Sequence, residues 1–347
     1  MTDSRLRVLV VDDSSVFRRV VIRCIESLPC SKVVGVAGNG REALEKLENL
    51  EVDLVLLDIK MPDMDGLQTL ERLKERGNRA RVIVLSGHSP RTVDNTVAAL
   101  LLGAEDFLVK PSHSKYSEHE LREKLAPHLT RPTVTSSIFP AAAAKASISS
   151  ARNFQALVVA ASTGGPKVLE QVFKALPDVH QPIFIAQHMP EDFTRALASQ
   201  LDACGVNRVK EAEHGERVQP STTYLAPGNH HLRICRQENH LVVTLDQAPR
   251  VKHCRPSADV LFRSAARCYG RSCLGLVLTG MGQDGLEGAR SVVDAGGEVF
   301  AQGQEGCVVW GMPKAVLEAG IARQVELAGL PDLLSRLLRP TSNAEGG

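Results

Sequence analysis

Three polar residues that could together activate a hydroxyl group follow apolar runs far apart in the chain. Ser162 follows Val-Val-Ala-Ala, His188 follows Ile-Phe-Ile-Ala-Gln, and Asp284 follows Leu-Val-Leu-Thr-Gly-Met-Gly-Gln. Serine, imidazole and carboxylate are the parts of an activated nucleophile. If the three runs are strands of one parallel sheet, their carboxyl ends open into one crevice. The pattern predicts that His188 takes the Ser162 proton and that Asp284 orients the ring.

The turn around Ser162 has a second interpretation. The apolar run ends abruptly at this serine, and Gly164, Gly165 and Pro166 then start a segment with helical apolar spacing. Backbone N–H groups at such a helix start favour an oxyanion, but they favour a bound phosphate equally well. The turn lacks the Gly-Lys-Ser/Thr of a P-loop, which weakens the phosphate alternative.

Two further alternatives stay open beside the triad. His230 and His231 are rival bases, with a weaker case because they precede a predicted hairpin. The segment from Gly280 to Gly285, with Glu305 about 20 residues further on, fits the dinucleotide-binding fingerprint. However, Asp284 would place a carboxylate in the turn meant for pyrophosphate, and the segment lies late in its domain.

A second group of reactive residues lies at the ends of apolar runs in the first third of the chain. Asp12, Asp13 and Asp58 supply carboxylates, and Ser86 and Lys110 follow two later runs. Three carboxylates forced together repel one another unless a cation is present, and Mg²⁺ is the divalent ion suited to oxygen ligands. The group therefore predicts phosphoryl transfer to a carboxylate, with Lys110 pairing with the phosphoryl group and Ser86 donating a hydrogen bond to it.

The elements that must position these residues alternate between strands and helices. In the first third, strands are expected at 6–11, 32–37, 53–57, 81–85 and 105–109, with helices between them and after the last. Such alternation indicates a doubly wound α/β domain with a five-stranded parallel sheet.

The alternation resumes after residue 153. Strands are expected at 155–161, 182–187, 208–212, 222–226, 273–279 and 298–302, and helices after Pro166, Glu191, Pro256, Gly285 and Pro313. Residues 232–236 and 241–246 resemble an antiparallel hairpin around Gln-Glu-Asn. A second doubly wound α/β domain, made mixed by the hairpin, is therefore expected.

Length and composition indicate a globular protein of two domains. The chain has 347 residues, 43% hydrophobic and 23% charged, with a formal net charge of +1. The charge argues against binding to nucleic acid or an anionic membrane, and no apolar run is long enough to span a membrane. The polar start shows no signal peptide, and the eight cysteines form no Cys-x-x-Cys pair, so reduced thiols and a cytoplasmic location are expected. No element carries His and Cys at metal-ligand spacing.

The predicted boundaries follow from composition. Residues 1–130 form the first domain, 131–152 an Ala-, Ser- and Pro-rich linker, 153–338 the second domain, and 339–347 a disordered tail. A helix within the linker, at 141–149, is an alternative that does not move the boundary.

Residues 1–130 resemble the flavodoxin-like receiver domain of bacterial response regulators. The resemblance rests on Asp12-Asp13, on Leu-Leu-Asp-Ile-Lys-Met-Pro-Asp-Met-Asp-Gly around Asp58, on Ser86-Gly and on Lys110-Pro. It implies that Asp58 accepts a phosphoryl group from a histidine kinase. It further implies that Asp13, Asp58 and the Lys60 carbonyl hold Mg²⁺, with Asp12 in support. Ser86 and Phe107 would occupy the switch positions, where Phe departs from the common Tyr.

The rest of the chain resembles the catalytic domain of the chemotaxis protein-glutamate methylesterases, the CheB family. The matching motifs are Ala-Ser-Thr-Gly-Gly-Pro, Gln-His-Met-Pro, Tyr-Leu-Ala-Pro-Gly-Asn-His-His, Arg-Pro-Ser-Ala-Asp-Val-Leu-Phe, Thr-Gly-Met-Gly-Gln-Asp-Gly and Gly-Met-Pro-Lys-Ala. The resemblance implies Ser162, His188 and Asp284 as the triad, and backbone amides near Thr163 and Met281 as the oxyanion site. One departure is Ala160, where the family usually has Gly.

The expected function is therefore a phosphorylation-activated serine hydrolase. It would demethylate glutamate γ-methyl esters on chemoreceptors and deamidate glutamines, with a chemotaxis-type histidine kinase as phosphodonor. Mg²⁺ is expected in the receiver domain and no cofactor in the esterase. A monomer that meets the membrane only through receptors is expected. The alternative is a phosphorylation-switched binding module with an inactive hydrolase domain; a DNA-binding regulator is disfavoured because no basic recognition helix is found.

Overall fold

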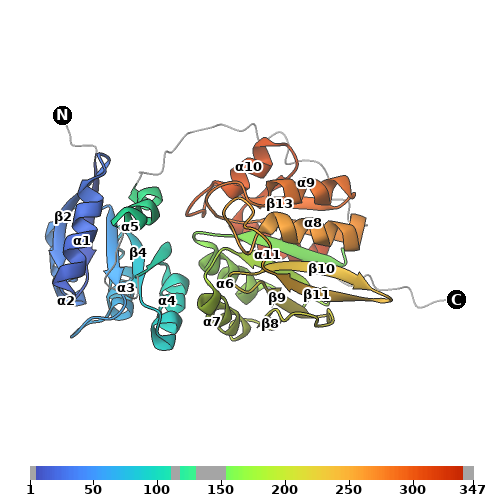
Figure 1. Ribbon diagram of the computed structural model, residues 1–347, viewed down its shortest axis with the longest axis horizontal. Helices are drawn as coiled ribbons and strands as arrows, with labels where there is room; N and C mark the ends of the chain where they lie inside the picture. The colour runs from blue at the N-terminus through green and yellow to red at the C-terminus, as the bar shows by residue number, and fades with distance from the viewer. Residues whose placement is uncertain (1–4, 111–117, 130–153, 339–347) are drawn as a thin grey trace. The chain divides into compact units, whose positions relative to one another are not determined.

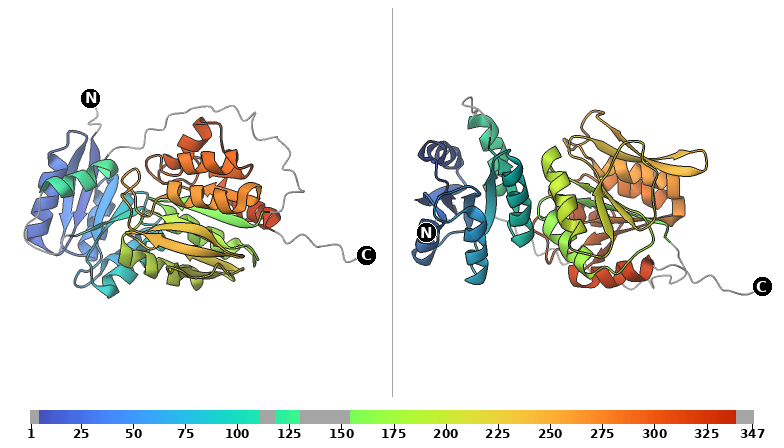
Figure 2. Two further views of the ribbon diagram at one scale, coloured as in Figure 1. Left: turned by 45° about the vertical axis from the view of Figure 1, so that its right-hand side comes forward. Right: turned by 90° about the horizontal axis from the view of Figure 1, so that it is seen from below.

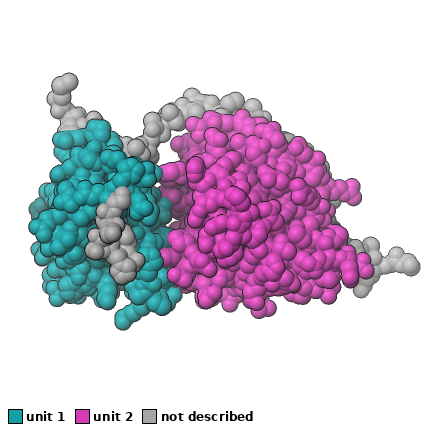
Figure 3. Space-filling model, in the orientation of Figure 1, with its two compact units in different colours: residues 1–137 teal, residues 138–347 magenta. Residues whose placement is uncertain are grey.

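A computed structural model describes residues 5–110, 118–129 and 154–338 (Figure 1). The chain divides into two compact units, residues 1–137 and 138–347, which are coloured separately in Figure 3. Each unit is described by itself. The predicted linker at 131–152 and the predicted tail at 339–347 lie outside the described residues, as does Pro111.

The first unit contains the five-stranded parallel sheet that the sequence predicts, in the order β2-β1-β3-β4-β5. Helices lie on both faces of this sheet, so the doubly wound, flavodoxin-like class is confirmed (Figure 2). The strands are β1 Leu6–Val11, β2 Ser31–Ala37, β3 Leu54–Asp58, β4 Arg81–Ser86 and β5 Asp106–Val109, and the helices are α1 Ser15–Glu26, α2 Gly40–Asn49, α3 Gly66–Glu75, α4 Pro90–Leu102 and α5 Glu118–Leu125.

The strand order of this sheet indicates where a ligand would bind. The order reverses between β1 and β3, and ligands of doubly wound sheets bind outside the carboxyl ends of strands at such a point. Asp12 follows β1 and Asp58 ends β3. Asp65 caps α3 through a capping box with Gln68, and a Cβ on Gly66 would lie 2.2 Å from the Asp58 carbonyl oxygen. Only glycine therefore lets α3 begin this close to the backbone of Asp58.

The second unit is built around a seven-stranded parallel sheet in the order β14-β13-β12-β6-β7-β9-β8. Helices α8, α9 and α10 pack in series, and α6 contacts α7 and α11. The strands are β6 Ala156–Ala161, β7 Ile183–Gln187, β8 Arg208–Glu211, β9 Thr222–Leu225, β12 Cys273–Val277, β13 Glu298–Gln302 and β14 Arg323–Val325, and the helices are α6 Gly165–Ala175, α7 Glu191–Asp202, α8 Ala258–Tyr269, α9 Leu286–Asp294, α10 Met312–Glu318 and α11 Leu330–Leu337.

The predicted antiparallel hairpin is confirmed and is one residue longer at each end of the first strand. It consists of β10 His231–Gln237 and β11 His240–Asp246, and β10 packs on α8. Strand β14 was not predicted, because Arg323–Val325 is only partly buried and contains no apolar run. Among the described residues, no helix combines the length and apolar character needed to cross a membrane.

Three neighbouring strands of the second sheet lead to the predicted triad. Strand β6 lies between β12 and β7, and all three are parallel and fully buried. Strand β12 ends at Val277, two residues before the predicted end, because the Gln302 side chain accepts the hydrogen bond from the Thr279 N–H at 3.0 Å. The chain then leaves the sheet and enters the loop that contains Asp284.

Candidate active site

Ser162 lies on a tight turn at the carboxyl end of β6. Its N–H donates to the Thr279 carbonyl at 3.0 Å, and its own carbonyl accepts from the Gly165 N–H at 2.8 Å and from Gln187 Nε2 at 3.0 Å. Gly164 has φ +79°, and a Cβ there would lie 2.5 Å from Val308. The turn therefore needs glycine, and it leaves the serine side chain partly exposed at the start of α6.

His188 leaves the neighbouring strand at the same level. Ala161 pairs with Gln187 in the β6–β7 ladder, and the His188 N–H donates to the Ala161 carbonyl at 3.0 Å. Ser162 and His188 are therefore the next residues along two adjacent parallel strands. No hydrogen bond joins the Ser162 hydroxyl to His188 in the described part of the chain.

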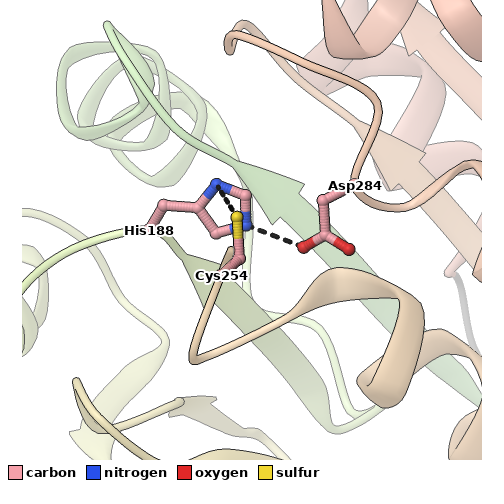
Figure 4. Close-up of side chains that lie close together, drawn as sticks. All are labelled: His188, Cys254 and Asp284. Atoms are coloured by element: carbon pink, nitrogen blue, oxygen red, sulfur yellow. Dashed lines mark hydrogen bonds and ion pairs between the residues drawn. The ribbon is translucent and has the colours of Figure 1, made fainter. Parts of the chain in front are cut away.

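Asp284 is the partner of His188 and is fully buried. Its Oδ2 lies 2.8 Å from His188 Nε2 (Figure 4). The carboxylate also accepts hydrogen bonds from the Ser257 hydroxyl at 2.8 Å and from the N–H groups of Ala258 and Asp259, at the start of α8, at 2.7 and 3.2 Å. Burial alone raises the pKa of Asp284, but the hydrogen bonds from His188, Ser257 and Ala258 hold this pKa below its ordinary value.

The ionised carboxylate determines which ring nitrogen of His188 carries a proton. A carboxylate can only accept, so Nε2 carries the hydrogen and Nδ1 is the nitrogen that can take a proton. Burial lowers the pKa of His188, but the hydrogen bonds with Asp284 and Cys254 outweigh this effect and raise the pKa to about 9. The Cys254 sulfur lies 3.7 Å from Nδ1 (Figure 4).

The predicted oxyanion residues lie in the Ser162 turn and in the loop after β12. Thr163 follows it directly, and its carbonyl accepts from the Thr279 hydroxyl at 3.0 Å. Met281 lies in the loop after β12 and is 41% exposed. Its neighbour Gly280 is held by a hydrogen bond from its N–H to the Val309 carbonyl at 2.9 Å.

The structure gives little support to the alternative bases, His230 and His231, or to a dinucleotide site. His231 is buried, its Nδ1 accepts from the Ser257 N–H at 3.2 Å, and its Nε2 lies 3.1 Å from the Pro249 carbonyl oxygen. Burial lowers its pKa, as expected for a neutral structural histidine. His230 Nδ1 lies 3.1 Å from the Gly228 carbonyl oxygen. Asp284 occupies the turn that the dinucleotide fingerprint would need for pyrophosphate.

Two residues at this site were missed by the sequence interpretation. Ser257 and Cys254 contact Asp284 and His188 only because the segment before α8 passes beside the ends of β7 and β12. The motif Arg-Pro-Ser-Ala-Asp contains Ser257, but nothing in its spacing relates it to Asp284. Asp259 supports the same loop by accepting from the N–H groups of Gly285 and Gly288 at 3.0 and 2.8 Å.

In the first unit, the structure brings the predicted carboxylates together. Asp12, Asp13 and Asp58 offer oxygen atoms that all lie within 4.8 Å of one another, which fits the oxygen-donor preference of Mg²⁺. Lys110 Nζ lies 2.6 Å from Asp12 and 2.7 Å from Asp58. Burial raises the pKa of Asp58 to about 6, although Lys110 opposes this shift. The Lys60 N–H donates to Asp58 at 3.4 Å.

The remaining predicted switch residues, Ser86 and Phe107, lie on β4 and β5. Ser86 ends β4, is fully buried, and its hydroxyl forms hydrogen bonds with Thr96 at 2.7 Å and with the Gly87 carbonyl at 3.0 Å. Phe107 lies in β5 and is partly buried. A phosphoryl group at Asp58 would have to draw the Ser86 hydroxyl from Thr96.

Comparisons with known proteins agree with both units. The CheB methylesterase family profile matches residues 157–334, and the response regulator receiver domain profile matches residues 8–125. A protein-glutamate methylesterase/protein-glutamine glutaminase of Nocardioides sp. is 40% identical, over 96% of this chain and 96% of that protein. The protein of the same name from Thermotoga maritima is 38% identical, over 94% and 96%.

A solved structure supports the fold of the second unit. The CheB methylesterase catalytic domain of Thermotoga maritima has 40% sequence identity and a TM-score of 0.52, and the match covers 53% of this chain and 99% of that one. The relatives are named as enzymes, so the alternative of an inactive binding module has no support. With a receiver domain before a methylesterase domain, and relatives matched over nearly their full length, this chain belongs to the CheB family of protein-glutamate methylesterases.

Proposed function

We propose that the chain is a phosphorylation-activated methylesterase that hydrolyses glutamate γ-methyl esters on methyl-accepting chemoreceptors and deamidates their glutamines, giving sensory adaptation. The observation that carries this assignment is the His188–Asp284 pair, 2.8 Å apart, at the end of the strand beside the Ser162 turn. All eight cysteines are unpaired, in keeping with the reducing cytoplasm to which we assign the chain. We further assign a monomer.

In the proposed reaction, Ser162 Oγ attacks the ester carbonyl while His188 Nδ1 takes the hydroxyl proton. Asp284 holds the ring in the required tautomer and stabilises the imidazolium. N–H groups near Thr163 and Met281 stabilise the oxyanion, and such preorganised donors are the largest single contribution in many acyl transfers. His188 then protonates the departing methoxide. Water, deprotonated by the same nitrogen, releases glutamate from the acyl-enzyme.

Deamidation uses the same groups on a different leaving group. Ser162 attacks the side-chain amide of glutamine, and His188 protonates the departing nitrogen so that ammonia leaves. Both substrates give one glutamyl-enzyme, so the two activities share the hydrolysis step. Their rates should therefore fall together when Ser162 or His188 is replaced.

We assign residues 1–130 as the receiver domain, 131–152 as the linker and 153–338 as the esterase domain. Asp58 accepts the phosphoryl group of a chemotaxis-type histidine kinase, and Lys110 pairs with it. Asp13, Asp58 and the Lys60 carbonyl would hold Mg²⁺, with Asp12 in support, and the ion would neutralise the charge of the phosphoryl group in transfer. Ser86 and Phe107 are the residues that respond to it.

The test is methanol release from a methylated receptor, with and without a small phosphodonor plus Mg²⁺. The phosphodonor should stimulate the full chain, and Asp58→Asn should abolish the stimulation while keeping the unstimulated rate. Asp63→Asn is a matched control, because Asp63 lies in the same loop with φ +63°, a conformation that Asn tolerates. Equal stimulation of wild type and Asp58→Asn would remove Asp58 from the proposal, and absence of methanol release would remove the esterase assignment.

A further inference from the structure

A tight turn beside the active site places two residues other than glycine in the left-handed region. Lys252 has φ +47° and His253 has φ +67°, and Val251 and Cys254 on either side exchange two backbone hydrogen bonds of 3.1 and 2.8 Å. Two-residue turns of this kind favour Asn and Gly, because larger side chains are strained there. Such strain persists where the surrounding structure fixes the residue, and it gathers at functional sites.

The Lys252 side chain shows what fixes this turn. Its Nζ lies 2.9 Å from Asp259 Oδ2 and donates a hydrogen bond of 2.9 Å to the Gln283 carbonyl. Asp259 lies in the first turn of α8 and its side chain is buried, whereas Gln283 lies in the loop after β12. One ammonium group therefore ties the turn to the start of α8 and to the loop that contains Asp284.

Asp284 lies between the groups that this ion pair holds. The Gln283 carbonyl, directly before it, accepts from Lys252. The N–H of Gly285, directly after it, donates to Asp259 Oδ1 at 3.0 Å. The Asp259 N–H also donates to Asp284 Oδ1 at 3.2 Å. The ion pair therefore fixes the backbone on both sides of Asp284.

The ammonium group also balances a buried charge. In the described part of the chain, Lys252 is the only ion-pair partner of Asp259. Removal of one partner of a buried ion pair leaves the other charge uncompensated, and the Asp259 side chain is only 1% exposed. Its neighbour Asp284 is a second buried carboxylate, and like charges repel. Without Lys252, we therefore expect Asp259 to move toward water and the Asp284 loop to move with it.

We propose that Lys252 is a positioning residue of the hydrolase. Its ammonium group keeps the Asp284 loop in place, so that the Asp284 carboxylate stays 2.8 Å from His188 Nε2. The strained turn brings the ammonium group to this position. The effect of Lys252 on the rate rests on the proposed function, whereas its effect on the position of Asp284 does not.

The position of Asp284 is tested by crystal structures of the full-length chain and its variants. In Lys252→Met, the distance from Asp284 Oδ2 to His188 Nε2 should grow beyond about 3.5 Å, where a hydrogen bond is lost. Lys252→Arg keeps a cation and should keep the contact. Lys174→Met is the matched control, because Lys174 lies at the end of α6 and pairs with another buried carboxylate, that of Glu170, at 2.7 Å. It should leave the contact unchanged. A wild-type contact in Lys252→Met would overturn the proposal.

The effect on the rate is tested by methanol release. Lys252→Met should lower kcat by about 10–100-fold with little change in KM, because misplacement of a catalytic group by about 1 Å can cost about 10²-fold. Lys252→Arg should restore part of the loss, and Lys174→Met should keep the wild-type kcat. A loss that appears only in KM would assign Lys252 to substrate binding and would remove the positioning role.

A double variant covers the case in which Lys252→Met does not fold. Lys252→Met/Asp259→Asn leaves no unpaired buried charge, and the Asn oxygen can still accept from the Gly285 N–H. Its melting temperature should exceed that of Lys252→Met, but its kcat should stay below the wild-type value, because the turn is no longer tied to the loop. Wild-type kcat in the double variant would contradict the proposal. If the wild type releases no methanol, the proposed function fails, and the crystal structures still decide what holds Asp284.

Discussion

Asp284 bonds to Nε2 of His188, which leaves Nδ1 as the ring nitrogen that can accept a proton. The 2.8 Å contact joins two groups from different strand ends, and the carboxylate is buried with four hydrogen-bond donors around it. In the mechanism that we propose, Ser162 would therefore deliver its proton to the Nδ1 side of the ring. The Cys254 sulfur lies over the face of the ring, 3.7 Å from Nδ1 (Figure 4).

Replacement of the nucleophile should remove nearly all activity. Ser162→Ala is expected to lower turnover by ~10⁶, the loss seen when one member of an interdependent triad is removed. A fluorophosphonate probe should label the wild type at Ser162 and leave the variant unlabelled. Ser199→Ala, an exposed serine on α7, should keep both labelling and rate. Near-normal methanol release by Ser162→Ala would show that another residue is the nucleophile.

The sequence could predict Ser162, His188 and Asp284 because each directly follows, or lies a few residues beyond, a buried apolar strand. Parallel strands share one functional edge, so position along each strand was enough to bring the three together. The carboxylates of the first unit could be predicted for the same reason.

The supporting residues could not be predicted in this way. Ser257 and Cys254 reach the site through the path of the segment before α8, which depends on long-range packing and leaves no period in the sequence. The early end of β12 likewise depends on a side chain, Gln302, that takes the place of a strand neighbour. Strand β14 was missed because its three residues carry too little apolar pattern.

The pH dependence of the esterase should follow the raised pKa of His188. Only the neutral ring can accept the serine proton, so kcat/KM in chelator-containing buffer should rise about tenfold per pH unit and level off above a pKa of about 9. Asp284→Asn removes the charge that raises this pKa, so the rising part of its pH–rate profile should move to lower pH. Rates with Ser162→Ala give the hydroxide background to subtract. If the wild-type kcat/KM levelled off near pH 6.5, this would contradict the pairing of His188 with Asp284.

The same pKa shift affects folding stability. A histidine whose folded-state pKa is raised stabilises the protein fully below its unfolded pKa of about 6.5, and this contribution is lost as pH rises through about 9. The wild type should therefore lose more thermal stability than Asp284→Asn between pH 6.5 and pH 10. Equal losses would indicate that the pair contributes nothing to folding.

Ser257 should act as a positioning residue for Asp284. Its buried hydroxyl donates to the carboxylate at 2.8 Å, and a hydrogen bond to a charged group contributes about 1.5–3 kcal/mol. Ser257→Ala should lower kcat/KM by about 10–100-fold and shift the rising part of the pH–rate profile. Ser257→Thr should restore part of the rate and part of the original pH–rate profile. Ser264→Ala removes another buried serine, on α8, that bonds to Ile234 and Leu261. This control should lower the melting temperature without shifting the pH–rate profile.

Gly280 should be required for the position of Ser162. A Cβ at this residue would lie 2.7 Å from the Ser162 Cβ and 2.5 Å from the Met312 sulfur. The glycine has little freedom to move away, because its N–H bonds to Val309 and its carbonyl accepts from the N–H groups of Gly311 and Met312. The added methyl group therefore has to displace the serine.

Gly280→Ala is thus expected to cost about 1–3 kcal/mol of stability through overpacking. It should also lower turnover by about 10²-fold, because a nucleophile displaced by about 1 Å no longer meets the base and the carbonyl together. Gly329→Ala is the matched control, since its φ is −91° and a Cβ there meets nothing within 4 Å. Thermal denaturation and methanol release on the same samples separate the two effects. A Gly280→Ala enzyme with wild-type turnover would show that the Ser162 turn can be displaced without loss of activity. In that case the bound substrate, rather than β6, would determine the position of the serine.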